Sequence, residues 1–199
     1  MIAIIDYGAG NLKSVKKAFD HIGVQTKIIN SIEDLSDALK IVLPGVGAFG
    51  AAAGRLKESG FHETISQWCR ANKPFLGICL GMQLLFESSL ESSNINGLGI
   101  FKGNCLRFKN HKVPQMGWNQ IRIVRYSKLL EGINDGSFFY FLHGYYVAPK
   151  DMKIVTANTQ YGVTYPSIIE RENVFAVQFH PEKSGELGLK ILKNWVELC

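Results

Sequence analysis

Short apolar runs alternate with helical stretches over the first 90 residues, and this alternation allows few folds. Residues 2–5, 41–43 and 74–78 are apolar throughout and residues 25–29 partly so, which predicts four strands. Fully apolar strands are typical of a sheet that is covered on both faces. The expected helices between and after them span residues 11–21, 31–39, 51–59, 62–71 and 80–88. Strand and helix in alternation predict an α/β fold with a doubly wound, mostly parallel central sheet and helices on both faces.

The second half of the chain has a different pattern, in which strands and turns predominate until a closing helix. Residues 100–124 read as strand and turn, residues 138–142 and 155–159 as strands, and residues 167–179 as strands joined by a tight turn at Glu172-Asn173. A helix is expected over residues 185–198. This pattern predicts a smaller antiparallel sheet, and without an internal repeat or linker we expect one domain over residues 1–199.

Composition excludes several classes of protein. Hydrophobic residues make up 46% and charged residues 20%, which is typical of a globular chain, and no apolar run approaches the roughly 20 residues of a membrane span. The net charge of +5 is scattered, so we expect neither nucleic acid nor a membrane as partner. The four cysteines lie far apart with no CxxC pair, so we expect no disulfide framework, no metal site and a cytoplasmic location.

A GxGxxG pattern at residues 45–50 follows the third strand and precedes a helix. Such a pattern can bind a dinucleotide, but it is a strong signal only when it follows the first strand of the fold. In addition, Pro44 forces a turn directly ahead of the pattern. The small residues leave backbone N–H groups uncovered, which suits an anion or a developing oxyanion. One functional hypothesis is thus a noncatalytic module that binds a dinucleotide through residues 45–50.

Cys79 carries the most informative motif, Gly77-Ile-Cys79-Leu-Gly81, at the junction of a predicted strand and helix. Glycines two residues before and after a nucleophile are typical of a nucleophile elbow, in which the turn is too tight for Cβ atoms on either side. The helix start behind Cys79 favours a negatively charged sulfur and offers the Leu80 N–H to an oxyanion. The alternative is a buried structural cysteine, as we expect for Cys69 and Cys105.

His180 follows an apolar strand in the segment Gln178-Phe-His180-Pro-Glu182. Open α/β sheets place their sites at the carboxyl ends of the strands, where Cys79 also lies. Glu182 can turn back to the imidazole and fix its tautomer. Nucleophile, base and orienting carboxylate would then be Cys79, His180 and Glu182, although a stand-alone cysteine hydrolase would use the same set.

Together these motifs resemble the class I, or triad, glutamine amidotransferases, and essentially the whole chain takes part in the resemblance. Further segments resemble the glutamine amidotransferase subunits of imidazole glycerol phosphate synthase, an enzyme of histidine biosynthesis. They are Asp6-Tyr-Gly-Ala-Gly-Asn-Leu12, Leu43-Pro-Gly-Val-Gly47, Val113-Pro-Gln-Met-Gly-Trp-Asn119 and Phe141-Leu-His-Gly-Tyr145. The resemblance implies a flavodoxin-like sheet and hydrolysis of L-glutamine to glutamate and ammonia.

The resemblance also implies roles for individual residues. The oxyanion would be held at Gly45, Val46 and Leu80, and Cys79, His180 and Glu182 would be catalytic. Glutamine would be bound by residues that line the site, namely Gly47, Gln83, His143, Gly144 and Tyr145. The implied partner is a (β/α)8-barrel cyclase subunit in a heterodimer, contacted by Asn11 and Lys183, and no cofactor is implied.

Two positions depart from the family pattern. Gln115 stands where the family commonly has histidine, and Gly144 stands where serine often follows the histidine. Neither position belongs to the expected triad. They leave open a paralogous amidotransferase that supplies ammonia for the modification of a surface-glycan sugar.

Overall fold

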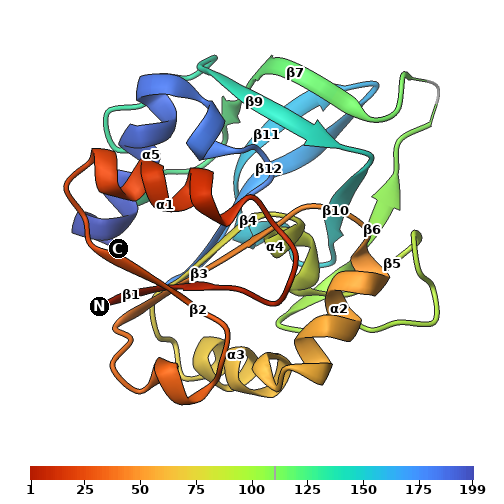
Figure 1. Ribbon diagram of the computed structural model, residues 1–199. Helices are drawn as coiled ribbons and strands as arrows, with labels where there is room; N and C mark the ends of the chain where they lie inside the picture. The colour runs from red at the N-terminus through yellow and green to blue at the C-terminus, as the bar shows by residue number, and fades with distance from the viewer. Residues whose placement is uncertain (110) are drawn as a thin grey trace.

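The computed structural model describes residues 1–109 and 111–199, and its main feature is a large central sheet (Figure 1). Within these residues the sheet has eight strands. In spatial order they are β2 (Thr26–Ile29), β1 (Ile2–Ile5), β3 (Lys40–Gly45), β4 (Phe75–Cys79), β13 (Val174–Val177), β12 (Val163–Arg171), β11 (Val155–Tyr161) and β8 (Arg122–Ile123). The pairings from β2 through β13 are parallel, and those from β13 to β8 are antiparallel.

Helices cover both faces of this sheet, so the predicted doubly wound α/β fold is confirmed. They are α1 (Leu12–His21), α2 (Phe49–Glu58), α3 (Phe61–Arg70), α4 (Leu80–Leu84) and α5 (Gly185–Leu198). Figure 1 shows α1 and α5 together on one side and α2 and α3 on the other. No helix in the described part of the chain is both long and apolar enough to span a bilayer.

The two-sided cover explains why the inner strands β1, β4 and β13 are apolar at every position. Successive side chains of a strand point to opposite faces. Ile2 and Ile4 accordingly belong to the core cluster under α1 and α5, whereas Ala3 and Ile5 belong to the cluster under α2 and α3. A polar residue on either face of β1 would therefore be buried.

Two smaller sheets complete the second half. One is β10 (Tyr145–Pro149), β6 (Phe101–Arg107) and β5 (Phe86–Ser89), and the other is β7 (Gln115–Gln120) with β9 (Phe138–His143). The β7–β9 and β10–β6 pairs are antiparallel, as expected, whereas β5 pairs with β6 in parallel. Short 3-10 helices are η1 (Glu33–Leu35), η2 (Lys128–Leu130), η3 (Met152–Ile154) and η4 (Pro181–Lys183).

The helix expected over residues 80–88 is wrong in its second half. The helix ends at Leu84, and a strand begins at Phe86. The ring of Phe86 lies 5.7 Å from the ring of Phe101 on β6. Pairing with β6 outweighs the local helix preference of this segment, which is a tertiary effect. The helix expected over residues 31–39 is much shorter than predicted, because only Glu33–Leu35 are helical and form the single 3-10 turn η1.

Candidate active site

Cys79 lies at the sharp turn between β4 and α4, with a left-handed backbone φ of 54°. The adjacent glycines are required by close packing. A Cβ added to Gly81 would lie 1.9 Å from the Leu43 carbonyl oxygen, and one added to Gly77 would lie 3.0 Å from the Gly81 backbone. The expected elbow is therefore present, and the backbone strain it stores at Cys79 is typical of functional turns.

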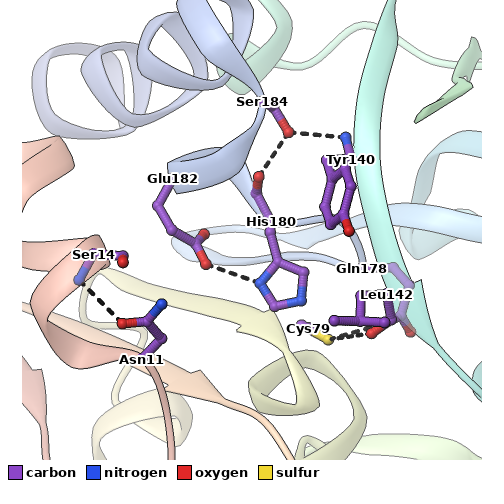
Figure 2. A network of polar contacts seen from close by, with 9 residues as sticks. All are labelled: Asn11, Ser14, Cys79, Tyr140, Leu142, Gln178, His180, Glu182 and Ser184. Carbon is purple, nitrogen blue, oxygen red and sulfur yellow. Dashed lines mark hydrogen bonds and ion pairs between the residues drawn. The ribbon is translucent and has the colours of Figure 1, made fainter. Parts of the chain in front are cut away.

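His180 is fixed by its backbone just beyond β13. Its N–H donates to the Tyr140 carbonyl at 2.9 Å, and its own carbonyl accepts from the Ser184 hydroxyl at 2.6 Å. Ser184 Oγ in turn accepts from the Tyr140 N–H at 3.0 Å. The two Ser184 bonds, drawn in Figure 2, join the start of the last helix to β9 and hold the backbone of His180 in place.

The imidazole of His180 lies between a carboxylate and a sulfur. Its Nδ1 is 2.9 Å from Glu182 Oε1, and both side chains are only 2% exposed. Figure 2 shows the opposite edge of the ring, which carries Nε2, on the side of Cys79. Nε2 makes no hydrogen bond with the described residues. Burial alone would lower the pKa of His180, but the neighbouring Cys79 sulfur and then Glu182 raise it to about 10. A proton on this ring is therefore stabilised by both neighbours.

A cleft of about 300 Å³ opens in front of the sulfur, so a small molecule can reach Cys79 even though the residue is only 4% exposed. Its walls come from the turn after β3, from α4, from the loop after β5, from the segment just before β7, and from the end of β9 and the start of β10. The lining residues are Val46, Gly47, Cys79, Leu80, Gln83, Glu91, Val113, Pro114, Leu142, His143, Gly144 and Tyr145.

The residues predicted to bind an oxyanion surround the nucleophile. Gly45 pairs with Cys79 across β3 and β4, and a Cβ added to it would lie 2.3 Å from Tyr7 Oη. Val46 and Leu80 line the same cleft as Cys79. The structure therefore brings the two predicted donor segments to the sulfur, while the roles of their N–H groups stay predictions.

The GxGxxG segment does not present a free helix start to a dinucleotide. Glu91 Oε2 accepts a hydrogen bond from the Phe49 N–H at 2.6 Å, at the first residue of α2. A carboxylate thus already occupies the position where a pyrophosphate would bind, and two negative groups there would repel each other. The dinucleotide alternative is therefore disfavoured.

The residues predicted to bind substrate form a connected polar wall of the cleft. The Tyr145 carbonyl accepts from Gln83 Nε2 at 2.9 Å and lies 2.7 Å from His143 Nδ1. Burial lowers the pKa of His143 to about 4, so this ring is neutral at physiological pH and donates its Nδ1–H to the carbonyl. Gly144, between these residues, also lines the cleft.

Both departures from the family pattern fit their surroundings. Gln115 is buried, and its Oε1 accepts a hydrogen bond from the Tyr165 hydroxyl at 2.8 Å. At Gly144 an added Cβ would lie 3.2 Å from Val113 Cγ1, which is a tight contact for any larger residue. Neither residue touches the three residues of the expected triad by a hydrogen bond in the described structure.

The two residues expected at a partner interface are exposed near this edge. Asn11 caps α1, since its Oδ1 accepts from the Ser14 N–H at 3.4 Å, and Figure 2 shows it beside Glu182. The Lys183 ammonium lies 5.9 Å from the centre of the Tyr140 ring. Their positions are compatible with an interface, which stays a prediction.

Five residues that reach the site were not predicted from the sequence. The Gln178 side chain contacts the Cys79 sulfur, and the cleft is also lined by Glu91, Val113, Pro114 and Leu142. Gln178 lies two residues before His180, and this closeness in the sequence was the one signal that could have placed Gln178 at the site. The Glu91 contact depends on how the loop after β5 folds back, which no local pattern indicates.

Comparison with known proteins identifies the family. Residues 3–198 match the family described as glutamine amidotransferase class-I. The chain is 52% identical to the imidazole glycerol phosphate synthase subunit HisH of Methanocaldococcus jannaschii, over 100% of both chains. It is 48% identical to the HisH subunit of Caldanaerobacter subterraneus subsp. tengcongensis, over 100% of this chain and 98% of that protein.

A solved structure described as a glutamine amidotransferase has the same fold, with a TM-score of 0.79 at 17% identity over 100% of this chain and 98% of that one. The shared fold, the elbow at Cys79 and the full-length relatives lead to one conclusion. The chain belongs to the class-I glutamine amidotransferases and, within them, to the HisH subunits of imidazole glycerol phosphate synthase.

Proposed function

We propose that this chain, as a single domain, hydrolyses L-glutamine to glutamate and passes the ammonia to a partner synthase subunit in histidine biosynthesis. The observation that carries the proposal is the grouping of Cys79, His180 and Glu182 at one cleft. The sulfur lies at the cleft wall, the imidazole faces it, and the carboxylate bonds the far side of the ring at 2.9 Å. This arrangement supplies a nucleophile, a base and a group that orients the base.

In the first half of the reaction, the Cys79 sulfur attacks the side-chain carboxamide carbon of glutamine. The sulfur is ionised at this point because its proton already lies on His180. As the new C–S bond forms, the carbonyl electron pair moves to oxygen. His180 then protonates the amide nitrogen, the C–N bond breaks, and ammonia leaves a thioester on Cys79. Glu182 keeps Nε2 directed at the sulfur because it holds the opposite ring nitrogen.

In the second half, water attacks the thioester. His180 takes one proton from the water as the C–O bond forms, and returns it to the sulfur as the C–S bond breaks and glutamate leaves. The oxyanion formed in each half would be bound by the N–H groups of Leu80 and of the Gly45-Val46 turn. One such donor is typically worth about 3 kcal/mol of transition-state stabilisation.

The α-amino and α-carboxylate groups of glutamine would be bound at the outer wall of the cleft. Gly47, Gln83 and the backbone from His143 to Tyr145 are the proposed contacts. Glu91 adds a carboxylate there, since its Oε2 bonds Phe49 and the side chain lines the cleft. A carboxylate in this place suits the α-ammonium group of glutamine.

The partner subunit would dock on the exposed face of β7 and β9, close to the cleft. Met116, Trp118 and Phe138 are 66%, 56% and 50% exposed, and the β7–β9 register puts them on one face. An exposed apolar patch beside a site is typical of a protein interface. We propose a (β/α)8-barrel cyclase as the partner, with Asn11 and Lys183 at the rim of the contact.

The competing functions are less well supported. The surface-glycan paralogue is not favoured, since relatives from 45% to 52% identical over the full chain are named as HisH subunits. A stand-alone hydrolase would act on esters or peptides without a partner. A cytoplasmic location fits the four cysteines, which are all free thiols.

The test is to compare glutamine with free ammonia as nitrogen source in the reconstituted complex. Cys79→Ala should abolish glutamine-dependent turnover and leave ammonia-dependent turnover unchanged. Loss of both activities in a folded complex would contradict this division of labour between the subunits. Full esterase or peptidase activity of the isolated chain would favour the stand-alone hydrolase instead.

A further inference from the structure

The side chain of Gln178 lies against the nucleophile and is fully buried. It follows β13, and its backbone N–H is held by the Ser167 carbonyl at 2.9 Å. Its Nε2 donates to Cys79 Sγ over 3.7 Å, a distance within the range of hydrogen bonds to sulfur. Gln178 takes no part in the proton transfers made by His180, so its presence at the sulfur requires a separate explanation.

The orientation of this amide is fixed by a chain of donors that begins at the backbone. The Tyr145 carbonyl can only accept, so the Gln83 amide must turn its NH₂ group toward it, at 2.9 Å. The same NH₂ group donates to Gln178 Oε1 at 3.2 Å. Rotating the Gln178 amide by half a turn would bring two NH₂ groups together, so its own NH₂ group has to face Cys79.

The two polar contacts of the sulfur respond to its charge in opposite ways. The neutral thiol can donate to the Leu142 carbonyl at 3.7 Å, but an ionised sulfur has no proton to donate and is repelled by that oxygen. The N–H of Gln178 gains strength when its acceptor becomes negative, because charge-assisted hydrogen bonds are about twice as strong as neutral ones. Gln178 therefore favours the ionised sulfur over the neutral thiol.

We propose that Gln178 is a positioning residue that stabilises the ionised Cys79 sulfur and aims it into the cleft, with its amide oriented by Gln83. This inference rests on the proposed role of Cys79 as the nucleophile. It assigns Gln83 a duty before substrate arrives, in addition to its proposed contact with glutamine.

Other groups around the sulfur are the same in every variant considered below. Tyr7, after β1, and Tyr165, on β12, both face Cys79, and burial raises the pKa of each phenol, so that both stay neutral. His180 supplies the positive charge, and His143, on β9, stays neutral. A change on replacing Gln178 would then report the loss of its N–H.

The experiment measures the rate of alkylation of Cys79 by iodoacetamide against pH, on the full chain, by mass spectrometry of the Cys79 peptide. Gln178→Met removes the donor at similar length, and we expect the pH midpoint to rise by about one unit, a tenfold loss of ionised sulfur at a given pH below it. Gln178→Glu keeps the acceptor for Gln83 and places an anionic oxygen at the sulfur, so its midpoint should rise at least as far.

Two further variants sharpen the result. Gln67→Met, on the exposed face of α3, is the matched control and should leave the midpoint unchanged. Gln83→Met removes the donor that orients the Gln178 amide but leaves the Gln178 N–H in place, so the shift of the midpoint should be smaller and in the same direction. Added to Gln178→Met it should have no further effect, because the two residues act through one contact. If Gln178→Met does not fold, Gln178→Glu and Gln83→Met make the same test.

In the complex, Gln178→Met should lower kcat with glutamine about tenfold below the midpoint, leave KM within about twofold, and recover as pH rises. Unchanged midpoints in both Gln178 variants, or an effect on KM alone, would overturn the inference. A wild-type complex that keeps its glutamine turnover after Cys79 is alkylated would contradict the proposed function instead. The two failures are therefore distinguishable.

Discussion

Cys79 and Cys105 are two buried thiols with similar local contacts and different surroundings. Cys79 is 4% exposed and its Sγ lies 3.7 Å from a backbone carbonyl oxygen, while Cys105 is fully buried with Sγ 3.6 Å from the carbonyl of Gln83. Cys105 lies inside β6, opposite Val147, where burial raises the pKa of its thiol. Cys79 ends a strand, borders the cleft and faces His180.

The comparison shows that burial by itself does not make a thiol inert. What Cys105 lacks in the described structure is the set of partners that Cys79 has: an imidazole, an amide N–H and space for a substrate. All three reach Cys79 because parallel strands deliver their carboxyl ends to one edge of the sheet. A regular position within a strand offers a side chain no such convergence.

After the loss of the nucleophile itself, the largest expected effect comes from removing the group that orients the base. Glu182→Gln keeps the size of the side chain but can hold the imidazole in the wrong tautomer, so kcat with glutamine should fall by about 10⁴. Turnover of the complex with free ammonia should stay at the wild-type rate. A loss of less than about tenfold with glutamine would show that Cys79 does not depend on this partner.

Selective alkylation compares the two thiols directly. At pH 7.5, iodoacetamide should modify Cys79 at least about 100-fold faster than Cys105, because only Cys79 borders a cleft and has partners for the ionised sulfur. Peptide mass spectrometry over time gives both rates in one sample. Similar rates would mean that the surroundings of the two thiols are equivalent.

Protonation of His180 should depend on its sulfur neighbour. The pKa of His180 is raised to about 10 by Cys79 and Glu182 together, against the effect of burial. Cys79→Ala removes one of the two raising groups, so the imidazolium should lose its proton at lower pH. We expect the titration midpoint in an NMR spectrum to fall by about two units. The Cys105→Ala variant is the control and should titrate like the wild type.

The smallest effect is expected for Cys105 itself. Cys105→Ala removes one buried sulfur from the core cluster and should lower the free energy of unfolding by about 1 kcal/mol. Glutamine turnover of the complex should stay within about twofold of wild type. Denaturant titration with an activity assay checks both, and a large loss of activity at full stability would give Cys105 a role the structure does not indicate.

Local sequence patterns predict much of this molecule. The apolar runs predict the parallel half of the sheet, because strands covered on both faces cannot carry polar side chains. The glycines around Cys79 predict the turn, since the Leu43 carbonyl leaves no space for a Cβ at Gly81. The proximity of His180 and Glu182 follows from their separation of two residues.

Contacts between distant segments were not predictable in the same way. The strand at Phe86 forms only because β6 is there to pair with it. Gln178 and Cys79 are 99 residues apart, and Glu91 reaches Phe49 across 42. Their meeting depends on how the sheet and the loops assemble, which periodicity and local motifs do not encode.

The most direct test of the central claim uses a diazoketone analogue of glutamine, which traps the nucleophile that attacks it. After treatment of the complex, mass spectrometry should find one adduct, on Cys79, with Cys105 unmodified and glutamine turnover lost in proportion to labelling. An adduct on another residue, or glutamine turnover that persists in fully labelled complex, would contradict the assignment of Cys79 as the nucleophile.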